Sequence, residues 1–235
     1  MITIQDLTVQ FGGVRPLNHL DACFDQPICG LIGPNGAGKT TLLNVLSGFA
    51  TPVSGRVFLD STDFLALSPP DRFRAGLRRS FQTEQVVDDL NVYDNLLAAC
   101  DQLGLTGRVA ARDITRALRH AGLFDAASRL GADLNLFERR MVEIAKSLLG
   151  NPRLILLDEP GAGLSEPESA ILRVRLKSIP VEFGCQILLI DHDVDLIAST
   201  CSQTLVLDFG ERLALGPTAD VLADQRVRNA YLGVE

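Results

Sequence analysis

The chain has 235 residues, of which 46% are hydrophobic, and its mean hydropathy is +0.18. That is enough apolar material for the core of one large domain or of two small lobes. The 22 basic and 29 acidic residues give a net charge of -7, which argues against a broad, sequence-independent grip on nucleic acid, so no nucleic-acid partner is expected.

The N-terminal stretch MITIQDLTVQF begins directly with strand-like alternation, so no signal peptide is predicted. No apolar run approaches the roughly 18 to 20 residues that a membrane-spanning helix needs. The five cysteines are odd in number and lack CxxC spacing, which favours buried thiols in a reducing compartment over disulfides or a metal site. We therefore expect a cytoplasmic protein, which can still dock on a membrane protein.

The first third of the chain predicts antiparallel β structure. Apolar residues alternate from Ile2 to Phe11, as in a strand interrupted by a turn, and Ser-Gly at 54–55 introduces a second strand, RVFLD. Between them, PICGLIG (27–33) is a short apolar run typical of a buried strand. KTTLLNVLSG then predicts a helix with Gly48 as its C-cap.

From about residue 84 to residue 150 the pattern becomes helical, in NVYDNLLAACDQL, DITRALRHAGL and RRMVEIAKSLLG. Strands return as RLILLD, CQILLID and TLVLD, with the helical SAILRVRLKSI between the first two. Apolar strands alternating with helices predict a parallel sheet covered on both faces. The expected fold is α/β: a nucleotide-binding core with an antiparallel β subdomain over 1–83 and 151–235, and a helical subdomain inserted at 84–150.

GPNGAGKTT (33–41) fits the phosphate-binding pattern G-x-x-x-x-G-K-[ST] and lies between a predicted strand and a predicted helix, as that pattern requires. Its glycines let backbone N–H groups turn toward a phosphate, and the helix N-terminus adds a positive dipole end. Lys39 would reach the β- and γ-phosphates of ATP, and the Thr40 hydroxyl would coordinate Mg²⁺. The alternative is a glycine-rich turn without a ligand. The expected nucleotide-binding residues of this loop are Gly33, Pro34, Asn35, Gly36, Ala37, Gly38, Lys39, Thr40 and Thr41.

Polar residues also follow two later apolar strands. After LILL, Asp158 can hold Mg²⁺ through water and Glu159 can polarise an attacking water, although two acids there could be a solvated strand end. His192 in LLIDHDVDLI is either a phosphate-sensing residue or a hydrogen-bonded structural histidine. Gln82 in RRSFQ, taken alone, is an ordinary polar surface residue.

The order GPNGAGKTT, SFQ, RRMVEIA, LILLDEP, GAGLSEPE and IDHD resembles the ATP-binding subunits of ABC transporters over essentially the whole chain. The resemblance implies a P-loop ATPase that dimerises head to tail and holds ATP and Mg²⁺ between one subunit's phosphate loop and the other's signature segment. By position, Phe11 would stack on adenine, Gln82 would link Mg²⁺ to the membrane partner, and His192 would be the switch histidine. Residues 163–166 would form the loop that crosses the dimer interface. The catalytic residues implied are Glu159, His192 and Gln82, and the metal-binding residues are Thr40, Gln82 and Asp158.

The segments QFGGVRPLNHL, LRRSFQTEQVVDDLNVYDNLLAA and VRNAYLGVE look like the ATPases of branched-chain amino acid importers and of their urea and amide relatives. The importer resemblance implies membrane permeases, a substrate-binding protein outside the membrane, and a peripheral location on its cytoplasmic face. We interpret residues 82–96 as the surface that docks on the permeases.

Three alternatives remain. ERRMVEIAKSL and VYDNL also resemble the ATPase of lipopolysaccharide export. Non-transport ABC ATPases are a second, but they usually carry coiled-coil insertions, tandem cores or basic extensions, which are not seen here. A small-molecule P-loop kinase is a third, and IDHD fits its lid-based layout poorly.

The signature pattern L-S-x-G-Q maps onto LNLFE, residues 134–138. Asn135 replaces the serine and could still donate a hydrogen bond to the partner's γ-phosphate. Phe137 replaces a glycine, and we expect it to displace or shield a backbone donor, because a bulky side chain disfavours both the close approach and the φ values that glycine permits. Glu138 adds a carboxylate that repels triphosphate unless it turns away. These changes predict a weak site and a heterodimer with one strong and one weak site; the alternative is that an ordinary amphipathic helix begins here.

Overall fold

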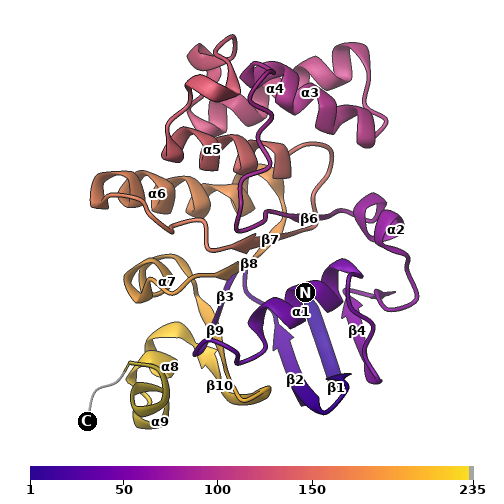
Figure 1. The fold of residues 1–235 in the computed structure, drawn as a ribbon, viewed down its shortest axis with the longest axis vertical. Coiled ribbons are helices and arrows are strands. Elements are labelled where there is room, and N and C mark those ends of the chain that lie inside the picture. Colours follow the sequence, from indigo (N-terminus) through magenta and orange to yellow (C-terminus); the bar gives the residue numbers. More distant parts are fainter. Residues whose placement is uncertain (233–235) are drawn as a thin grey trace.

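Two β-sheets and a set of helices make up residues 1–232, the part of the chain that the computed structural model describes (Figure 1). The larger sheet lies at the centre, and α3, α4 and α5 are grouped at one end of the molecule (Figure 1). The end of the VRNAYLGVE motif, residues 233–235, lies outside the described residues.

The larger sheet has six strands in the order β10-β9-β3-β8-β7-β6. Five of them run parallel, and β10 pairs antiparallel with β9. Every residue of β3, β7 and β8 is buried, as expected for parallel strands covered on both faces. The predicted α/β fold with a parallel sheet is therefore confirmed. The strands are β3 (Ile28–Ile32), β6 (Leu77–Arg79), β7 (Leu154–Asp158), β8 (Gln186–Ile190), β9 (Gln203–Asp208) and β10 (Glu211–Pro217).

The smaller sheet is antiparallel, in the order β2-β1-β4-β5. The turn expected within β1 is an irregularity of an otherwise continuous strand, with Asp6 at φ 47°. Strand β2 was not predicted, because its buried Leu17 and Leu20 are three positions apart in the sequence and His19 between them has φ 48°. That break hides the period of two by which a strand is identified. The strands are β1 (Ile2–Phe11), β2 (Val14–Phe24), β4 (Ser54–Leu59) and β5 (Thr62–Asp63).

The helical patterns in the sequence correspond to helices in the structure. Gly48 ends α1 in the left-handed conformation, at φ 82°, as predicted for a glycine C-cap. Buried residues of α3, α4 and α5 share one hydrophobic cluster with side chains of β7 and β8, so the helical segment is packed onto the sheet. The helices are α1 (Lys39–Ser47), α2 (Pro69–Arg74), α3 (Val92–Gln102), α4 (Gly107–Ala121), α5 (Leu136–Ser147), α6 (Glu166–Phe183), α7 (Val194–Thr200), α8 (Thr218–Ala223) and α9 (Gln225–Val227).

The cysteines are all free thiols, and four of the five are buried. Burial raises the pKa of Cys29 to about 12 and that of Cys185 to about 11, which keeps both thiols protonated and unreactive near neutral pH. Over residues 1–232, no helix combines the length and the apolar character needed to cross a membrane.

Candidate functional site

The phosphate loop connects β3 to α1 and depends on glycine at particular positions. Gly36 and Gly38 have φ values of 82° and 104°, in the region that favours glycine. A Cβ on Gly38 would lie 2.1 Å from the carbonyl oxygen of Pro16, and one on Gly33 would lie 2.1 Å from that of Leu207. The loop is thus held against β2 and β9 at distances that no other residue permits.

Lys39, the first residue of α1, folds back over this loop. Its Nζ donates hydrogen bonds to the carbonyl oxygens of Gly33, at 2.6 Å, and Pro34, at 2.9 Å. Burial lowers the pKa of Lys39, while the carboxylates of Glu159 and Asp158 act to raise it. The ammonium group is therefore a partly desolvated cation beside the loop, which is the electrostatic setting that attracts a phosphate.

A cavity of about 260 Å³ lies in front of the loop. It is smaller than most small-molecule sites, which measure roughly 300–1,000 Å³, so it suits the phosphates of a nucleotide better than the whole molecule. Of the predicted loop residues, Gly33, Pro34 and Ala37 are not among those that line it. Its lining is Pro16, Asn35, Gly36, Gly38, Lys39, Thr40, Thr41, Asp158, Glu159 and Ile190.

Asp158 ends β7 at the edge of this cavity and is 8% exposed. Burial raises its pKa, and the nearby guanidinium of Arg79 acts to lower it. Arg79 Nη2 lies 3.6 Å from Asp158 Oδ2, and Nη1 donates to Asn44 Oδ1 at 2.8 Å. Arg79 was not predicted as a site residue, although RRSFQ places it three residues before Gln82. Its position opposite Asp158 follows from the pairing of β6 with β7.

Glu159 follows Asp158 and has an unusual backbone, with φ 52°. A non-glycine residue in this region costs on the order of 1–3 kcal/mol, and such strain occurs often at functional sites. Its N–H donates to the carbonyl oxygen of Ile190 at 2.8 Å. Gln82 Nε2 donates to Glu159 Oε2 at 3.1 Å, and His192 Nδ1 lies 3.9 Å from that same oxygen. Gln82 and His192, from separate parts of the chain, therefore both lie beside the carboxylate of Glu159.

Asp191 is a second residue that the sequence analysis missed. It is 1% exposed, and its carboxylate accepts the N–H groups of Gly161 and Asp193, both at 3.0 Å. Burial raises its pKa, and the two N–H groups act to lower it. This side chain ties the segment after Glu159 to the segment that carries His192. The sequence offered one signal for Asp191, its position in IDHD directly before His192.

Phe11 and Asn135 do not line the cavity. Phe11 ends β1 with 55% of its surface exposed. Asn135 is the N-cap of α5, in the helical segment.

The first turn of α5 is closed by a capping box. Asn135 Oδ1 accepts the Glu138 N–H at 2.8 Å, and Glu138 Oε2 accepts the Asn135 N–H at 3.0 Å. The Glu138 carboxylate also pairs with Arg129. Burial acts to raise the pKa of Glu138, but the contacts with Arg129 and the Asn135 N–H lower it overall. The carboxylate therefore has partners within its own chain and turns toward them.

Phe137 does not need the φ values that glycine permits, so its predicted effect on the backbone donor can come only from shielding or displacement by the ring. Phe137 lies within α5, is absent from the residues with positive φ, and packs its ring, partly buried, against the hydrophobic cluster below. The first turn of a helix uses φ values open to every residue, so the conformational freedom of glycine is not needed here. The phenylalanine ring instead fills space beside this turn that a glycine would leave open.

The three expected metal-binding residues lie around a second cavity of about 420 Å³, next to the first. Thr40, Gln82 and Asp158 all line it, and Thr40 and Asp158 line both cavities. A hydroxyl, an amide carbonyl and a carboxylate are the oxygen ligands that Mg²⁺ accepts. The donor set therefore fits this metal.

The chain is similar to proteins of known function along almost its entire length. A family profile described as ABC transporter matches residues 22–162. The high-affinity branched-chain amino acid transport ATP-binding protein LivG of Escherichia coli (strain K12) is 32% identical over 249 aligned residues, which cover 99% of this chain and 98% of that protein. The lipopolysaccharide export system ATP-binding protein LptB of the same strain is 32% identical, with 99% and 97% covered.

The same fold is found in solved structures. The ADP conformation of MJ1267, an ATP-binding cassette of an ABC transporter, superposes with a TM-score of 0.89 at 24% sequence identity, covering 100% of this chain and 99% of that one. This agreement extends over both sheets and the helical segment.

Proposed function

The chain belongs to the ABC transporter family as an ATP-binding ATPase subunit, and on that premise we propose that it powers import of branched-chain amino acids or related small amides as one of two unequal ATPase subunits. The observation that carries the ATPase part is the meeting of Gln82, Glu159 and His192 beside the phosphate loop. The similarity to LivG supports the choice of cargo.

In the proposed reaction, backbone N–H groups of the phosphate loop and the Lys39 ammonium hold the β- and γ-phosphates of ATP. Lys39 exchanges its carbonyl partners, Gly33 and Pro34, for phosphate oxygens. Glu159 orients the attacking water and accepts its proton, while Gln82 and His192 position the carboxylate and sense the γ-phosphate. The proposed adenine contact is Phe11, whose exposed ring is free to stack on a base.

Mg²⁺ would be held by Thr40, Asp158 and Gln82, and when bound it neutralises charge on the phosphates. Asp158 is prepared for this role by Arg79, which keeps a buried carboxylate close to a positive charge. We also propose that residues 1–83 and 151–235 act as the nucleotide-binding core and residues 84–150 as the lobe that moves against it.

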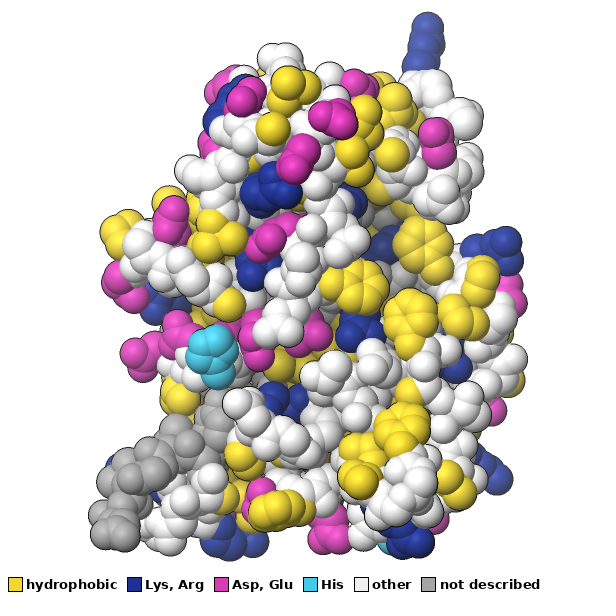
Figure 2. Space-filling view, in the orientation of Figure 1, with side chains coloured by type: hydrophobic (Ala, Val, Ile, Leu, Met, Phe, Trp, Pro, Cys, Tyr) yellow, Lys and Arg dark blue, Asp and Glu magenta, His cyan; other side chains and the backbone are white. Residues whose placement is uncertain are grey.

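The proposed permease contact is a groove of about 210 Å³ between α3, α5 and the β6 strand. Phe73, Phe81 and Leu103 supply apolar surface there, and hydrophobic side chains are visible on this side of the molecule (Figure 2). Helix α5 holds the adjoining 82–90 segment in place: Lys146 Nζ donates to the carbonyl oxygen of Gln85 at 2.7 Å, and Arg140 Nη1 to that of Gln82 at 3.1 Å. A permease pressing on the groove would therefore act directly on the segment that carries Gln82.

This contact makes the subunit peripheral on the cytoplasmic face of the membrane, with a substrate-binding protein supplying cargo from the other side. The predicted docking segment, residues 82–96, contributes only Gln85 to the groove lining. The rest comes from the neighbouring helices and from β6, so the proposed docking surface is wider than that segment.

The unequal pairing rests on the first turn of α5. In a head-to-tail dimer this turn would face the partner's ATP, yet the Glu138 N–H is already bonded to Asn135. The partly buried Phe137 occupies space where the family pattern has glycine, and Leu136 beside it is 41% exposed. Loss of one preorganised donor costs about 3–4 kcal/mol in the transition state, or roughly 10²- to 10³-fold in rate. A second subunit with an intact signature would complete the phosphate loop of this chain.

The test compares ATP hydrolysis by the purified chain with that of Asn135→Ser/Phe137→Gly, which restores the serine and the glycine of the family pattern. We expect slow hydrolysis by the wild type and an increase of about tenfold or more in the variant. Asn135→Ser/Phe137→Ala is the matched control, because it removes the same ring without adding a glycine; an equal increase there would assign the effect to the ring alone. Vigorous turnover by the wild-type chain alone would refute the unequal pair.

Cargo is tested separately, by reconstituting the chain with its cognate permeases in vesicles and following uptake of labelled leucine. The similarity to LptB favours one other outcome, in which the same complex extracts lipopolysaccharide and leucine does not move. That result would refute the import proposal and leave the ATPase assignment intact.

A further inference from the structure

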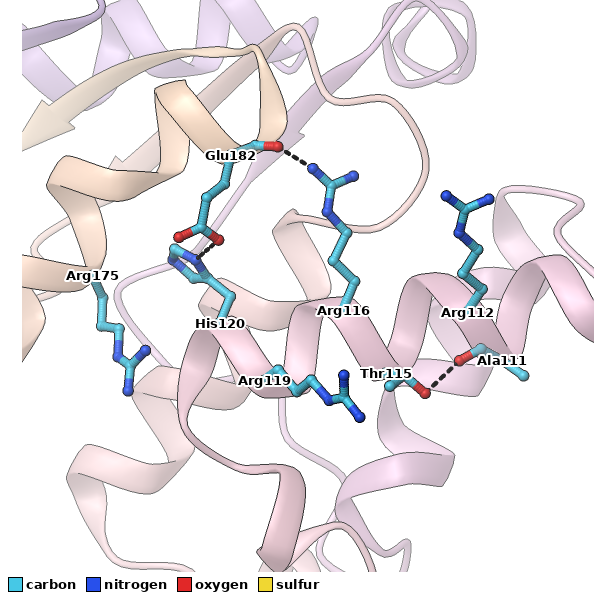
Figure 3. Close-up of a pocket in the computed structure, with 8 residues that line it drawn as sticks. All are labelled: Ala111, Arg112, Thr115, Arg116, Arg119, His120, Arg175 and Glu182. Carbon is cyan, nitrogen blue, oxygen red and sulfur yellow. Dashed lines mark hydrogen bonds and ion pairs between the residues drawn. The ribbon is translucent and has the colours of Figure 1, made fainter.

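A basic cavity lies between α4 and α6, away from the nucleotide site (Figure 3). Its volume is about 700 Å³, within the roughly 300–1,000 Å³ typical of small-molecule sites. It shares no lining residue with the two cavities beside the phosphate loop. The lining residues are Ala111, Arg112, Thr115, Arg116, Arg119, His120, Arg175 and Glu182.

Four guanidinium groups thus surround one cavity, in a protein whose net charge is -7. Across residues 1–232, the ion pairs include none of Arg112, Arg116, Arg119 and Arg175. Glu182 is the one acidic residue in the lining, and its carboxylate Oε2 lies 2.8 Å from His120 Nδ1. The lining therefore carries four guanidinium groups against one carboxylate, an excess of positive charge.

Contacts within the protein hold this arrangement in place. The Arg116 guanidinium donates to the backbone carbonyl of Glu182, in the last turn of α6, and lies over the Phe183 ring, 4.2 Å from its centroid. Arg119 lies 4.9 Å from the centroid of the Phe124 ring. His120 is buried, and its Nε2 has no hydrogen-bond partner among residues 1–232. The contacts of Arg116 and Arg119 reduce the entropy that these side chains lose when a ligand binds.

The spacing of the arginines distinguishes between ligands. Arg112, Arg116 and Arg119 lie on successive turns of α4, so their Cα atoms span about 10 Å along the helix at about 1.5 Å per residue. Arg175 approaches from α6, on the other side of the cavity (Figure 3). Groups spread over this length suit several linked phosphates better than a single phosphate. The planar guanidinium group also suits phosphate oxygens, which it can bind in pairs.

We propose that this cavity is a second ligand site, which binds a small molecule carrying two or more phosphate groups. The site joins the helical segment to α6, the helix that begins seven residues after Glu159. A bound polyphosphate bridges α4 to α6 and restrains the helical segment relative to the sheet.

The probe is inorganic tripolyphosphate, titrated calorimetrically without divalent metal into the Lys39→Ala protein, in which the phosphate loop no longer competes. We expect one molecule bound per chain, with affinity that falls as salt is added. In the same background, Arg112→Gln/Arg175→Gln should raise the Kd about tenfold or more, because charge-assisted hydrogen bonds are lost. Arg116 is left intact, since it also caps α6.

The matched control is Arg56→Gln/Arg228→Gln, which removes two exposed arginines outside the cavity and changes the net charge equally. The Kd should stay within about twofold of the Lys39→Ala value in this control, and orthophosphate should bind far more weakly than tripolyphosphate. Absence of tripolyphosphate binding, or an equal loss in both double variants, overturns the proposal. So does binding to vesicles of phosphatidylglycerol through Arg112 and Arg175 without tripolyphosphate binding, which would identify a membrane contact instead.

Discussion

Replacing Arg79 with methionine should uncouple Asp158 from Mg²⁺ at neutral pH. Both side chains are about nine-tenths buried, and their charged atoms lie 3.6 Å apart. At an effective dielectric constant of about 20, two unit charges at this distance attract by about 4–5 kcal/mol. Removal of one partner from a buried pair usually costs roughly 3–5 kcal/mol, because the remaining charge is left without compensation.

The loss acts on the protonation of Asp158. Burial already raises the pKa of this carboxyl, and Arg79 is the largest influence that lowers it. Without the guanidinium, the pKa rises further, and a larger fraction of Asp158 is protonated at a given pH. A protonated carboxyl is a poor Mg²⁺ ligand, so the Mg²⁺-dependent part of the ATP affinity should fall and should recover as the pH is raised.

The assay measures the affinity of the chain for ATP with Mg²⁺ and with a chelator, from about pH 6 to pH 9. This range lies above the usual aspartate pKa of about 3.9. We expect the ratio of the two affinities to fall about tenfold or more at pH 7 in Arg79→Met, and less in Arg79→Lys, which keeps the charge but lacks the second nitrogen that bonds Asn44. Thermal unfolding of both variants controls for loss of the fold. An unchanged affinity ratio at every pH in folded Arg79→Met protein would refute the reasoning.

Three other predictions concern single contacts. Lys39→Ala should abolish detectable ATP binding, because Lys39 carries the only ammonium group in the lining of the cavity beside the phosphate loop. An affinity for ATP close to that of the wild type, measured by calorimetry, would remove the phosphate-loop assignment. Glu159→Gln keeps the size of the side chain but cannot accept a proton, so the variant with ATP should stay in a dimer with the cognate partner, detected by gel filtration. Unchanged ATP turnover would exclude Glu159 as the acceptor of the proton from water. Glu138→Gln should lower the free energy of unfolding by about 0.5–1 kcal/mol at pH 7 through the weakened pairing with Arg129. Since the pKa of Glu138 is lowered in the folded state, this difference is fully present above the unfolded pKa and should vanish as the pH falls through the folded pKa; a pH-independent difference would contradict it.

The residues proposed to handle phosphate could be picked out from the sequence because each follows a strand whose apolar run is unmistakable. GPNGAGKTT follows ICGLI, Asp158 and Glu159 follow LILL, and His192 follows QILLI with one residue between. The carboxyl ends of parallel strands meet at one edge of the sheet, so a chain with this pattern must bring these residues near one another. The α/β fold and the helical segment were predictable on the same grounds.

The finer geometry depended on contacts between residues far apart in the chain. Arg79 was missed because β6 has only three residues, two of them arginines, and becomes a strand by pairing with β7. Phe137 was expected to displace or shield a backbone donor partly because glycine permits unusual φ values there, but the capping box of α5 gives this position ordinary helical geometry. The basic cavity could not be predicted either, since Arg175 lies more than fifty residues from the arginines of α4. Local sequence patterns determined which chemical groups this protein has, and the packing of α4, α5 and α6 against the sheet decided which of them act together.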